Sequence, residues 1–260
     1  MREKSIVKEI YAPNEGISLW WLGQAGFAAK FDEVLVFIDP VIELEKDEDL
    51  LRSEIGQRLF QPLPLLAREV TQADLVLLSH DHRDHTAPKT VPYLARTDAI
   101  FLCTAHCARK VRELGVREEK IKPLHYGDEF AYQDLKIRCI IAEHSGPVGT
   151  ACGFVIRSPQ GNLYYPGDTS LLPEHLELKD IDILLLSITE NVLGIEDAAK
   201  LANALGSRYL IPCHYGTYDH EARWTVADPE ALRPLIEQSE ERLFILRQGE
   251  RFRPSRLARP

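Results

Sequence analysis

The sequence lacks several features that would place it in other classes of protein. No apolar run approaches the roughly 20 residues that span a bilayer, and the opening MREKSIVKEIYAPNEG has no apolar core of a signal peptide. The five cysteines are odd in number and include no CxxC pair, so neither a disulfide framework nor a cysteine-rich zinc finger is indicated. We therefore expect a cytoplasmic protein whose cysteines are reduced thiols in the core.

A basic surplus, a linker and an internal repeat are also missing. The formal net charge is -9, whereas proteins that grip nucleic acid over a broad face need clustered lysine and arginine. Proline and glycine are dispersed rather than gathered into a linker. A chain of 260 residues with 45% hydrophobic content can bury one large core. These features predict a single domain over residues 1–260, disfavour nucleic acid as a partner, and are compatible with a homo-oligomer.

What the sequence does contain is a series of short aliphatic and β-branched runs bounded by turn residues. Residues 106–115 and 194–206 have apolar positions at helical spacing and end in glycine, as helices do. The acidic residues 43–56 predict an exposed helix or a loop leading into one. Strands interleaved with helices predict an α/β layered fold. The expected strands cover residues 17–23, 33–40, 74–80, 99–104, 134–144, 152–158, 162–168, 182–188, 209–214 and 242–249.

Six of these strands finish at a side chain that could bind or support a metal ion. Ligand sites in α/β sheets lie at the carboxyl ends of strands, where several segments of the chain converge. We therefore expect the six strand ends to form one site. The residues concerned are Asp39, His80, His144, Asp168, Glu190 and His214.

The motif SHDHRDH, residues 79–85, directly follows one of these apolar strands. In an extended segment alternate side chains share a face, so His80 and His82 can reach one ion, and a turn after Arg83 can direct Asp84 and His85 toward a second. A single histidine would be interpreted as a surface or hydrogen-bonded residue, but this cluster predicts a metal site. Imidazole and carboxylate ligands without thiolate suit Zn²⁺, Mn²⁺ or Fe²⁺, of which we favour Zn²⁺.

The motif resembles that of the metallo-β-lactamase fold superfamily. Three further stretches support the resemblance in the expected order: EHSG (143–146), YYPGDTS (164–170) and PCHYG (212–216). Two others, LWWLGQAGF (19–27) and DILLLSITENVLGIEDAAKLA (182–202), are similar to the branch of ascorbate-6-phosphate lactonase-like metal-dependent hydrolases. The resemblance implies a four-layer αββα sandwich.

The resemblance also implies a role for each ligand. It places His80, His82 and His144 on a first divalent ion, Asp84, His85 and His214 on a second, and Asp168 between the two. Asp39 would orient histidines by hydrogen bonding. The ascorbate-6-phosphate lactonases can depart from histidine at the position of His144, so its presence here favours two complete sites.

Two neighbouring cations lower the pKa of a shared water, hold it as a bridging hydroxide and polarise the electrophile, which is metal-assisted hydrolysis. Asp84 could accept the proton of that water while remaining a ligand. We therefore expect a hydrolase acting on a small, anionic ester, lactone or phosphoester, a phosphorylated lactone among them. The alternatives are a metal-dependent nuclease or phosphodiesterase of the same fold and a non-catalytic metal-binding protein.

Several other residues are candidates for contact with the substrate or for support of the ligands. For Trp21 a place at the mouth of the site and a place in the core are equally favoured, and Cys213 is expected in the core. We interpret His106, His125 and His175 as structural or surface histidines, because no partner lies at ligand spacing. The remaining candidates for substrate or supporting contacts are Gln24, Glu190, Asn191, Tyr215 and His220.

Overall fold

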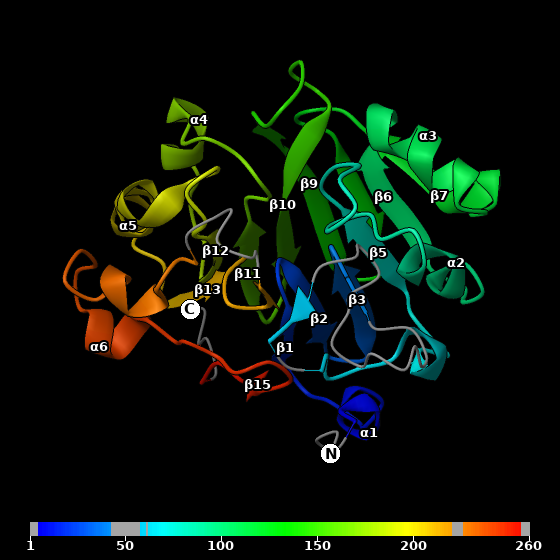
Figure 1. Cartoon of the computed structure of the whole chain (residues 1–260), viewed down its shortest axis with the longest axis horizontal. Helices are drawn as coiled ribbons and strands as arrows, with labels where there is room; N and C mark the ends of the chain where they lie inside the picture. Colours follow the sequence, from blue (N-terminus) through cyan, green and yellow to red (C-terminus); the bar gives the residue numbers. More distant parts are fainter. Residues whose placement is uncertain (1–4, 43–57, 61, 220–225, 256–260) are drawn as a thin grey trace.

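Two β-sheets packed face to face form the centre of the protein in a computed structural model, with helices on both outer sides (Figure 1). The structure describes residues 5–42, 58–60, 62–219 and 226–255. Helices α2 and α3 cover one sheet, and α4, α5 and α6 cover the other. This arrangement confirms the predicted α/β layered fold of αββα type.

The first sheet changes from antiparallel to parallel pairing across its width. Strands β15, β1, β2 and β3 pair antiparallel, while β3, β5, β6 and β7 pair parallel. The carboxyl ends of β3, β5 and β6 therefore share one edge. In spatial order the strands are β15 (Arg251–Phe252), β1 (Ile17–Gly23), β2 (Gly26–Phe31), β3 (Val34–Ile38), β5 (Leu75–Leu78), β6 (Ile100–Thr104) and β7 (Ile121–Leu124).

The second sheet has the same mixed character. Its parallel part contains β11, β12 and β13, and β8 to β11 pair antiparallel. In spatial order the strands are β13 (Tyr209–Cys213), β12 (Ile183–Ser187), β11 (Gly161–Tyr165), β10 (Ala151–Ser158), β9 (Leu135–Ala142) and β8 (Glu129–Tyr132). A small separate pair joins β4 (Arg58–Leu59) to β14 (Tyr218–Asp219).

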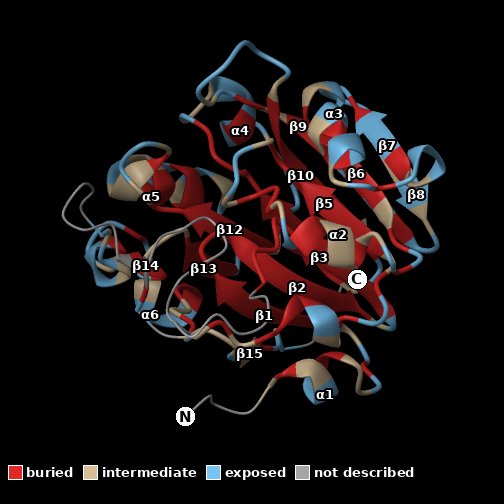
Figure 2. Cartoon of the chain, turned by 45° about the vertical axis from the view of Figure 1, so that its right-hand side comes forward, coloured by how far each residue is buried: buried red, intermediate tan, exposed pale blue. Residues whose placement is uncertain are grey.

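The helices are mostly short and lie on the outer faces of the sheets. Figure 2 shows the strands buried and the exposed residues on the outer sides of the helices and at the β7–β8 edge. The α-helices are α1 (Val7–Ile10), α2 (Thr90–Leu94), α3 (Ala105–Glu113), α4 (Pro173–Leu176), α5 (Gly194–Leu205) and α6 (Ser239–Arg242), and 3₁₀ turns cover Ala67–Glu69, Glu118–Lys120 and Pro229–Leu232. No helix within the described ranges is long and apolar enough to cross a membrane.

Three layers of apolar side chains hold these elements together. Strand β1 shows how one strand contributes to two of them: Leu19 and Trp21 face the core between the sheets, whereas Trp20 and Leu22 face the layer under α2 and α3. All seven of its residues are buried, because both faces of the sheet are covered. The five cysteines are buried free thiols, as predicted, and Cys213 lies in the core between the sheets.

Most expected elements are present, but one expected strand is wrong, and six strands of the described chain were not expected: β2, β7, β8 and the two-residue strands β4, β14 and β15. Residues 242–249 do not form a strand: α6 ends at Arg242, Leu243 makes a single bridge to Leu210, and the chain then runs irregularly. The Arg242 guanidinium donates to the carbonyl oxygens of Ser207, Glu237 and Ala202, which turns this segment toward the end of α5 instead of along the sheet. Strands β7 and β8 were missed because they are short edge strands with many exposed residues. The acidic residues 43–56 lie outside the described part of the chain.

Candidate metal centre

The carboxyl ends of strands from both sheets meet at one edge of the sandwich. Residues Asp39 and His80 follow β3 and β5 of the first sheet, and His144, Asp168 and His214 follow β9, β11 and β13 of the second. Together with His82, Asp84 and His85 they form three groups whose potential ligand atoms lie within 4.8 Å of one another, and Asp168 Oδ2 lies 3.3 to 3.8 Å from imidazole nitrogens of these groups. The structure therefore brings together five of the six predicted strand ends, and the sixth, Glu190, is treated below.

The motif after β5 forms a tight turn rather than an extended segment. The His82 carbonyl oxygen accepts hydrogen bonds from the backbone N–H groups of His85 (3.0 Å) and Thr86 (2.7 Å). The Thr86 hydroxyl donates to the His80 carbonyl oxygen at 2.6 Å and closes the turn. The turn thus begins at His82, one residue before the position expected from the sequence, and it separates the ligands into two groups.

The first cluster consists of His80, His82 and His144. The Nε2 atom of His144 lies 3.2 Å from Nδ1 of His82. Burial holds the pKa of His80 well below its usual value and also lowers that of His144, so both imidazoles are neutral. The Nε2 atom of His80 is buried and has no hydrogen-bond partner among the described residues. Neutral imidazoles with a free lone pair are the donors that a divalent transition metal requires.

The second cluster consists of Asp84, His85 and His214. The Nε2 atoms of the two imidazoles lie 3.3 Å apart, and Asp84 Oδ2 lies 3.8 Å and 3.6 Å from them. Burial alone would lower the pKa of His85, but the carboxylates of Asp168, Asp84 and Asp39 raise it well above its usual value. In the same way Asp168 raises the pKa of His214 against the effect of burial. This cluster therefore attracts a positive charge, either protons or a cation.

Asp168 lies between the two clusters. Its Oδ2 atom is 3.3 Å from Nε2 of both His85 and His214, and 3.8 Å from Nε2 of His144. Burial would raise the pKa of this carboxyl group, but the neighbouring His214 and His85 hold it well below its usual value. The Oδ1 atom is buried and has no hydrogen-bond partner within the described ranges. An ionised, buried oxygen without a donor is strongly destabilising unless a cation or a proton approaches it.

A close backbone approach brings Asp168 to this position. Gly167 has φ +68°, and a Cβ atom there would lie 2.7 Å from the Cys152 carbonyl oxygen and 3.0 Å from Cβ of Ser79. Only glycine allows the loop after β11 to pass so close to the loop after β5. The YYPGDTS stretch therefore needs its glycine in order to place the carboxylate between the clusters.

Asp39 lies next to both clusters and is saturated with hydrogen bonds. Its Oδ2 atom accepts from His85 Nδ1 (2.7 Å) and from the hydroxyls of Tyr165 (2.6 Å) and Ser79, and its Oδ1 atom accepts from the Ser79 backbone N–H at 2.7 Å. Because Nδ1–H of His85 is donated to Asp39, the Nε2 lone pair remains free for the cluster. The Ser79 hydroxyl also lies 2.9 Å from Nδ1 of His80, so one serine connects both clusters.

Gln24 is tied to the second cluster at several atoms. Its side-chain amide N–H donates to Asp84 Oδ2 at 3.1 Å, and its backbone carbonyl oxygen accepts from the His214 backbone N–H at 2.8 Å. Trp21 donates its indole N–H to the same carbonyl at 2.9 Å and stacks on Tyr215 with ring centroids 5.0 Å apart. The Trp21 ring is buried, so it holds the Gln24 loop in place and presents little surface to a substrate.

The other predicted candidates have no hydrogen bond to the clusters within the described part of the chain. Glu190 and Asn191 are exposed in the turn after β12, and no hydrogen bond between described residues joins them to the ligands. The Tyr215 hydroxyl is buried without a hydrogen-bond partner in the described part of the chain, and burial raises its pKa. His220 lies outside the described residues.

The remaining histidines occupy structural or surface positions. His175 is buried, with Nε2 bonded to the Ile141 carbonyl oxygen at 2.8 Å. His106 bonds Asp81 at 3.2 Å and also contacts Arg109, and the side chain of His125 is exposed. None of these three belongs to the groups of ligand atoms found among the described residues.

Three supporting residues were missed by sequence reasoning: Ser79, Tyr165 and Ser145. Ser145 lies with its hydroxyl 3.0 Å from Nε2 of His82. All three stand inside motifs that the sequence made conspicuous, namely SHDHRDH, YYPGDTS and EHSG. Their positions next to ligands were the available signal, but which of them turns inward depends on the tertiary structure.

Comparison with known proteins agrees with this geometry. Residues 35–215 match the model of the beta-lactamase superfamily domain. A UPF0173 metal-dependent hydrolase of Pyrobaculum aerophilum is 28% identical over 239 residues, covering 88% of this chain and 96% of its own.

Two solved structures share the fold. Igni18, a metallo hydrolase of Ignicoccus hospitalis, has a TM-score of 0.72 at 22% identity and covers 93% of this chain and 100% of its own. An isothiocyanate hydrolase from Delia radicum gut bacteria has a TM-score of 0.69 at 19% identity and covers 91% and 98%. The chain therefore belongs to the beta-lactamase superfamily and, with its curated relatives, to the metal-dependent hydrolases of the metallo-β-lactamase fold.

Proposed function

We propose that the protein is a dinuclear metal-dependent hydrolase that cleaves a small, anionic ester, lactone or phosphoester. The observation that carries the proposal is the position of Asp168. Its Oδ2 atom lies within 3.8 Å of imidazole nitrogens from both clusters, while its Oδ1 atom is buried without a donor among the described residues. One carboxylate shared between two sets of imidazoles is the arrangement expected for two neighbouring cations.

The proposed ligand set fits two divalent ions. The first cluster offers three imidazoles, the second offers two imidazoles and a carboxylate, and Asp168 is available to both. Ions bound there would polarise the scissile carbonyl or phosphoryl group and lower the pKa of the attacking water. Because these ligands include nitrogen and oxygen donors but no thiolate, they suit Zn²⁺, Mn²⁺ and Fe²⁺. Of these three ions we propose Zn²⁺.

The two carboxylates have different roles in this proposal. Asp84 has a side chain that is 27% exposed, whereas that of Asp168 is 5% exposed. Burial would raise the pKa of Asp84, but His85 and His214 lower it, so Asp84 is ionised at neutral pH. We assign Asp84 to accept the proton of the attacking water, with Gln24 fixing its orientation through Oδ2. Asp168 stays ionised and holds the two clusters together.

The outer supports keep the ligand atoms directed inward during turnover. Asp39 holds the tautomer of His85, and Ser79 links Asp39 to the ring of His80. Trp21 and Tyr215 stack behind the Gln24 loop, which keeps the second cluster from shifting. Exposed Glu190 and Asn191 remain candidates for substrate contact, as does His220, which lies outside the described residues.

An anionic substrate is compatible with the charge of the protein if the two clusters hold cations. The chain carries a formal net charge of -9, which repels anions at long range. Cations held by the two clusters would supply the local positive potential that a phosphate or carboxylate group needs. The ester or lactone bond rests on the likeness of residues 19–27 and 182–202 to lactonase-like hydrolases.

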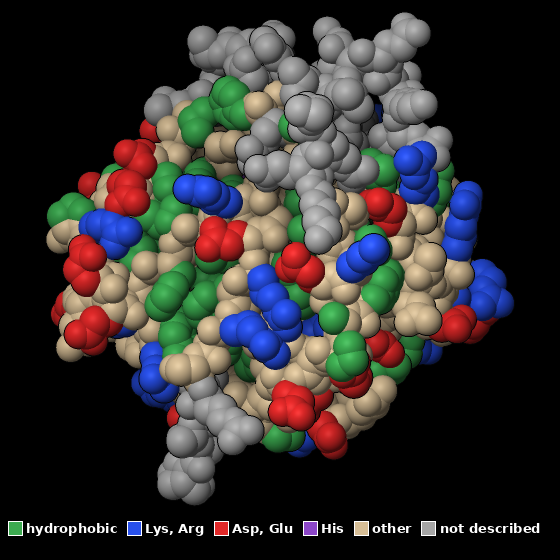
Figure 3. Space-filling view, turned by 90° about the horizontal axis from the view of Figure 1, so that it is seen from below, with side chains coloured by type: hydrophobic (Ala, Val, Ile, Leu, Met, Phe, Trp, Pro, Cys, Tyr) green, Lys and Arg blue, Asp and Glu red, His purple; other side chains and the backbone are tan. Residues whose placement is uncertain are grey.

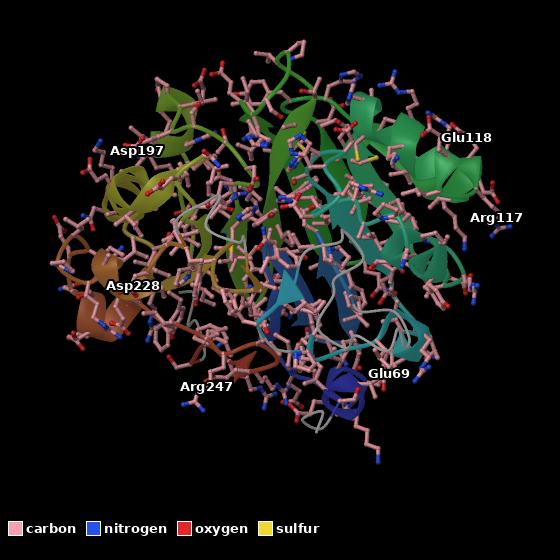
Figure 4. All side chains as sticks on the ribbon, in the orientation of Figure 1. Glu69, Arg117, Glu118, Asp197, Asp228 and Arg247 are labelled. Carbon is pink, nitrogen blue, oxygen red and sulfur yellow. The ribbon has the colours of Figure 1, made fainter. Side chains whose placement is uncertain are left out.

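A nuclease of the same fold is the less favoured alternative. On the face shown in Figure 3, lysine and arginine alternate with aspartate and glutamate instead of forming a basic stripe. Two outer cations are also neutralised locally: Lys200 pairs with Asp197 at 2.7 Å, and Arg112 pairs with Glu118. Asp197 and Glu118 are labelled at the periphery in Figure 4. Nucleic acid binding over a broad surface needs unpaired, clustered cations.

Purified protein, chelated and then reloaded with Zn²⁺ or Mn²⁺, should be assayed against matched neutral and phosphorylated lactones, phosphodiesters, β-lactams and single-stranded RNA. Isothiocyanates belong in the panel because a protein of the same fold is an isothiocyanate hydrolase. We expect metal-dependent hydrolysis, faster for the phosphorylated lactone than for the neutral one. RNA cleavage without small-molecule hydrolysis would favour the nuclease, and inactivity across the panel would favour a non-catalytic metal-binding protein.

A further inference from the structure

His82 is the one exposed residue among the seven proposed ligands. It lies at the start of the turn after β5, and its ring is not enclosed by the core as those of His80 and His85 are. Holding an exposed side chain in one rotamer costs conformational entropy. A ligand in this position therefore depends on a specific contact to keep its ring directed at the first cluster.

Ser145 supplies that contact from the other sheet. Its hydroxyl lies 3.0 Å from Nε2 of His82, while Nδ1 of the same ring lies 3.2 Å from Nε2 of His144. Adjacent residues of one loop thus approach both nitrogens of the ring. A neutral imidazole carries one N–H, so donation from Nε2 to the Ser145 oxygen leaves the Nδ1 lone pair facing the first cluster.

The backbone at Ser145 indicates that the side chain matters. Its φ is +25°, and the Gly146 N–H donates to the His144 carbonyl oxygen across it in a tight turn. The loop is anchored on both sides, by a bond from the Ser170 N–H to the Glu143 carbonyl oxygen and one from the Thr104 hydroxyl to the Thr150 carbonyl oxygen. A positive φ favours glycine. If only the turn were required, glycine would serve better than serine at this position.

The geometry points to Ser145 as a positioning residue that fixes the ring of His82 for the first metal ion. This inference rests on the proposed function, since it requires the first cluster to bind metal. The serine acts through His82 and does not itself touch the ion. Supports of this kind typically change metal affinity by about 10- to 100-fold.

The test compares Ser145→Gly and Ser145→Ala with the wild-type protein in Zn²⁺ titrations against a competing chelator. His144→Ala identifies the binding step that belongs to the first cluster. Ser170→Ala is the matched control, because Ser170 is an exposed serine in the neighbouring loop whose side chain makes no hydrogen bond to a described residue. We expect both Ser145 variants to weaken the first-cluster step about 10- to 100-fold and to leave the other step unchanged, with Ser170→Ala indistinguishable from wild type.

The glycine variant separates a positioning role from a merely structural one. It relaxes the backbone, so its thermal unfolding should be unimpaired while its Zn²⁺ affinity falls. Wild-type affinity in Ser145→Gly would overturn the inference and leave the proposed function intact. If His144→Ala removes no binding step that the wild-type protein shows, the dinuclear proposal is overturned, and the role of Ser145 with it.

Discussion

Replacing Asp39 by asparagine tests whether this carboxylate supports the metal centre or binds an ion itself. Asp39 accepts four hydrogen bonds, three of them at Oδ2, from His85, Tyr165 and Ser79. Asparagine has one oxygen, so in either orientation its NH₂ group faces a buried donor. A buried donor left without an acceptor costs about 1–3 kcal/mol, and the remaining bonds weaken because they no longer reach a charged group. The variant should therefore lose at least about 1–3 kcal/mol of unfolding free energy.

The same change should weaken metal binding without abolishing it. Without the carboxylate, Nδ1–H of His85 meets either the NH₂ group or the neutral oxygen of the asparagine, so its tautomer is held less firmly. We expect the second-cluster Zn²⁺ affinity to fall about 10- to 100-fold, which is about 1.4–2.7 kcal/mol. Calorimetric Zn²⁺ titration measures this loss, and urea unfolding of chelated protein measures the change in stability.

Asp74→Asn is the matched control, because Asp74 stands at the opposite end of β5. It also accepts a tyrosine hydroxyl, from Tyr132 at 2.9 Å, and a backbone N–H, from Leu35 at 2.8 Å. This variant should lose stability yet bind Zn²⁺ as wild type does. Unchanged affinity in Asp39→Asn would refute the supporting role. Loss of one whole equivalent of metal would instead make Asp39 a ligand, since it also lies within 4.8 Å of the ligand atoms of His80 and His85.

Three further predictions concern the clusters themselves. Asp168→Ala should abolish turnover and lower Zn²⁺ retention, measured by elemental analysis. His125→Ala, on the exposed β7–β8 connection, is the control and should change neither. Equal losses in the two variants would mean that the site is misplaced. On acidification the second cluster should release its ion at higher pH than the first. The carboxylates around His85 raise the pKa of this histidine against the effect of burial, so protons compete with the ion there at higher pH. In the first cluster burial lowers the pKa of His80, so protons compete only at lower pH. Simultaneous release in pH-stepped dialysis would contradict this order. Gln24→Ala should lower kcat more than it raises KM, because it frees Asp84 Oδ2, and an effect on KM alone would place Gln24 at the substrate instead.

The sequence predicted buried aliphatic strands better than edge strands, and it missed β2, whose residues GFAAKF are buried but form no aliphatic run. Strands such as Leu75–Leu78 and Ile183–Ser187 are fully buried on both faces and therefore appear as continuous apolar runs. Strands β7 and β8 lie at the sheet edges, where half-exposed residues give no such run. Residues 242–249 also contain an apolar run, and Leu243 and Leu246 are buried. The segment nevertheless makes a single β-bridge, from Leu243 to Leu210, and not the repeated backbone pairing of a strand. Apolar content alone cannot distinguish these two kinds of burial.

For the site, the chain order fixed which groups could meet but not which atoms face one another. The strand-end rule predicted that five of its residues meet at one edge, and the structure brings them together there: Asp39, His80, His144, Asp168 and His214. It also selected Glu190, which the turn after β12 leaves exposed. The hydroxyls of Ser79 and Tyr165 could not be assigned, because Ser79 reaches Asp39 from the neighbouring strand of the same sheet and Tyr165 reaches it from the other sheet, and neither pairing can be read from the sequence.

Backbone conformation shows how the site is held in place. Four residues around the clusters, Gln24, Asp39, Ser145 and His214, have positive φ values between 25° and 62°. Such conformations cost of order 1–3 kcal/mol each and persist where surrounding contacts determine them. Here those contacts are hydrogen bonds within the protein. The backbone carbonyl oxygen of Gln24 accepts from the backbone N–H of His214, and the carboxylate of Asp39 accepts four hydrogen bonds. Hydrogen bonds within the protein therefore position the proposed ligands, as the proposed cation site requires.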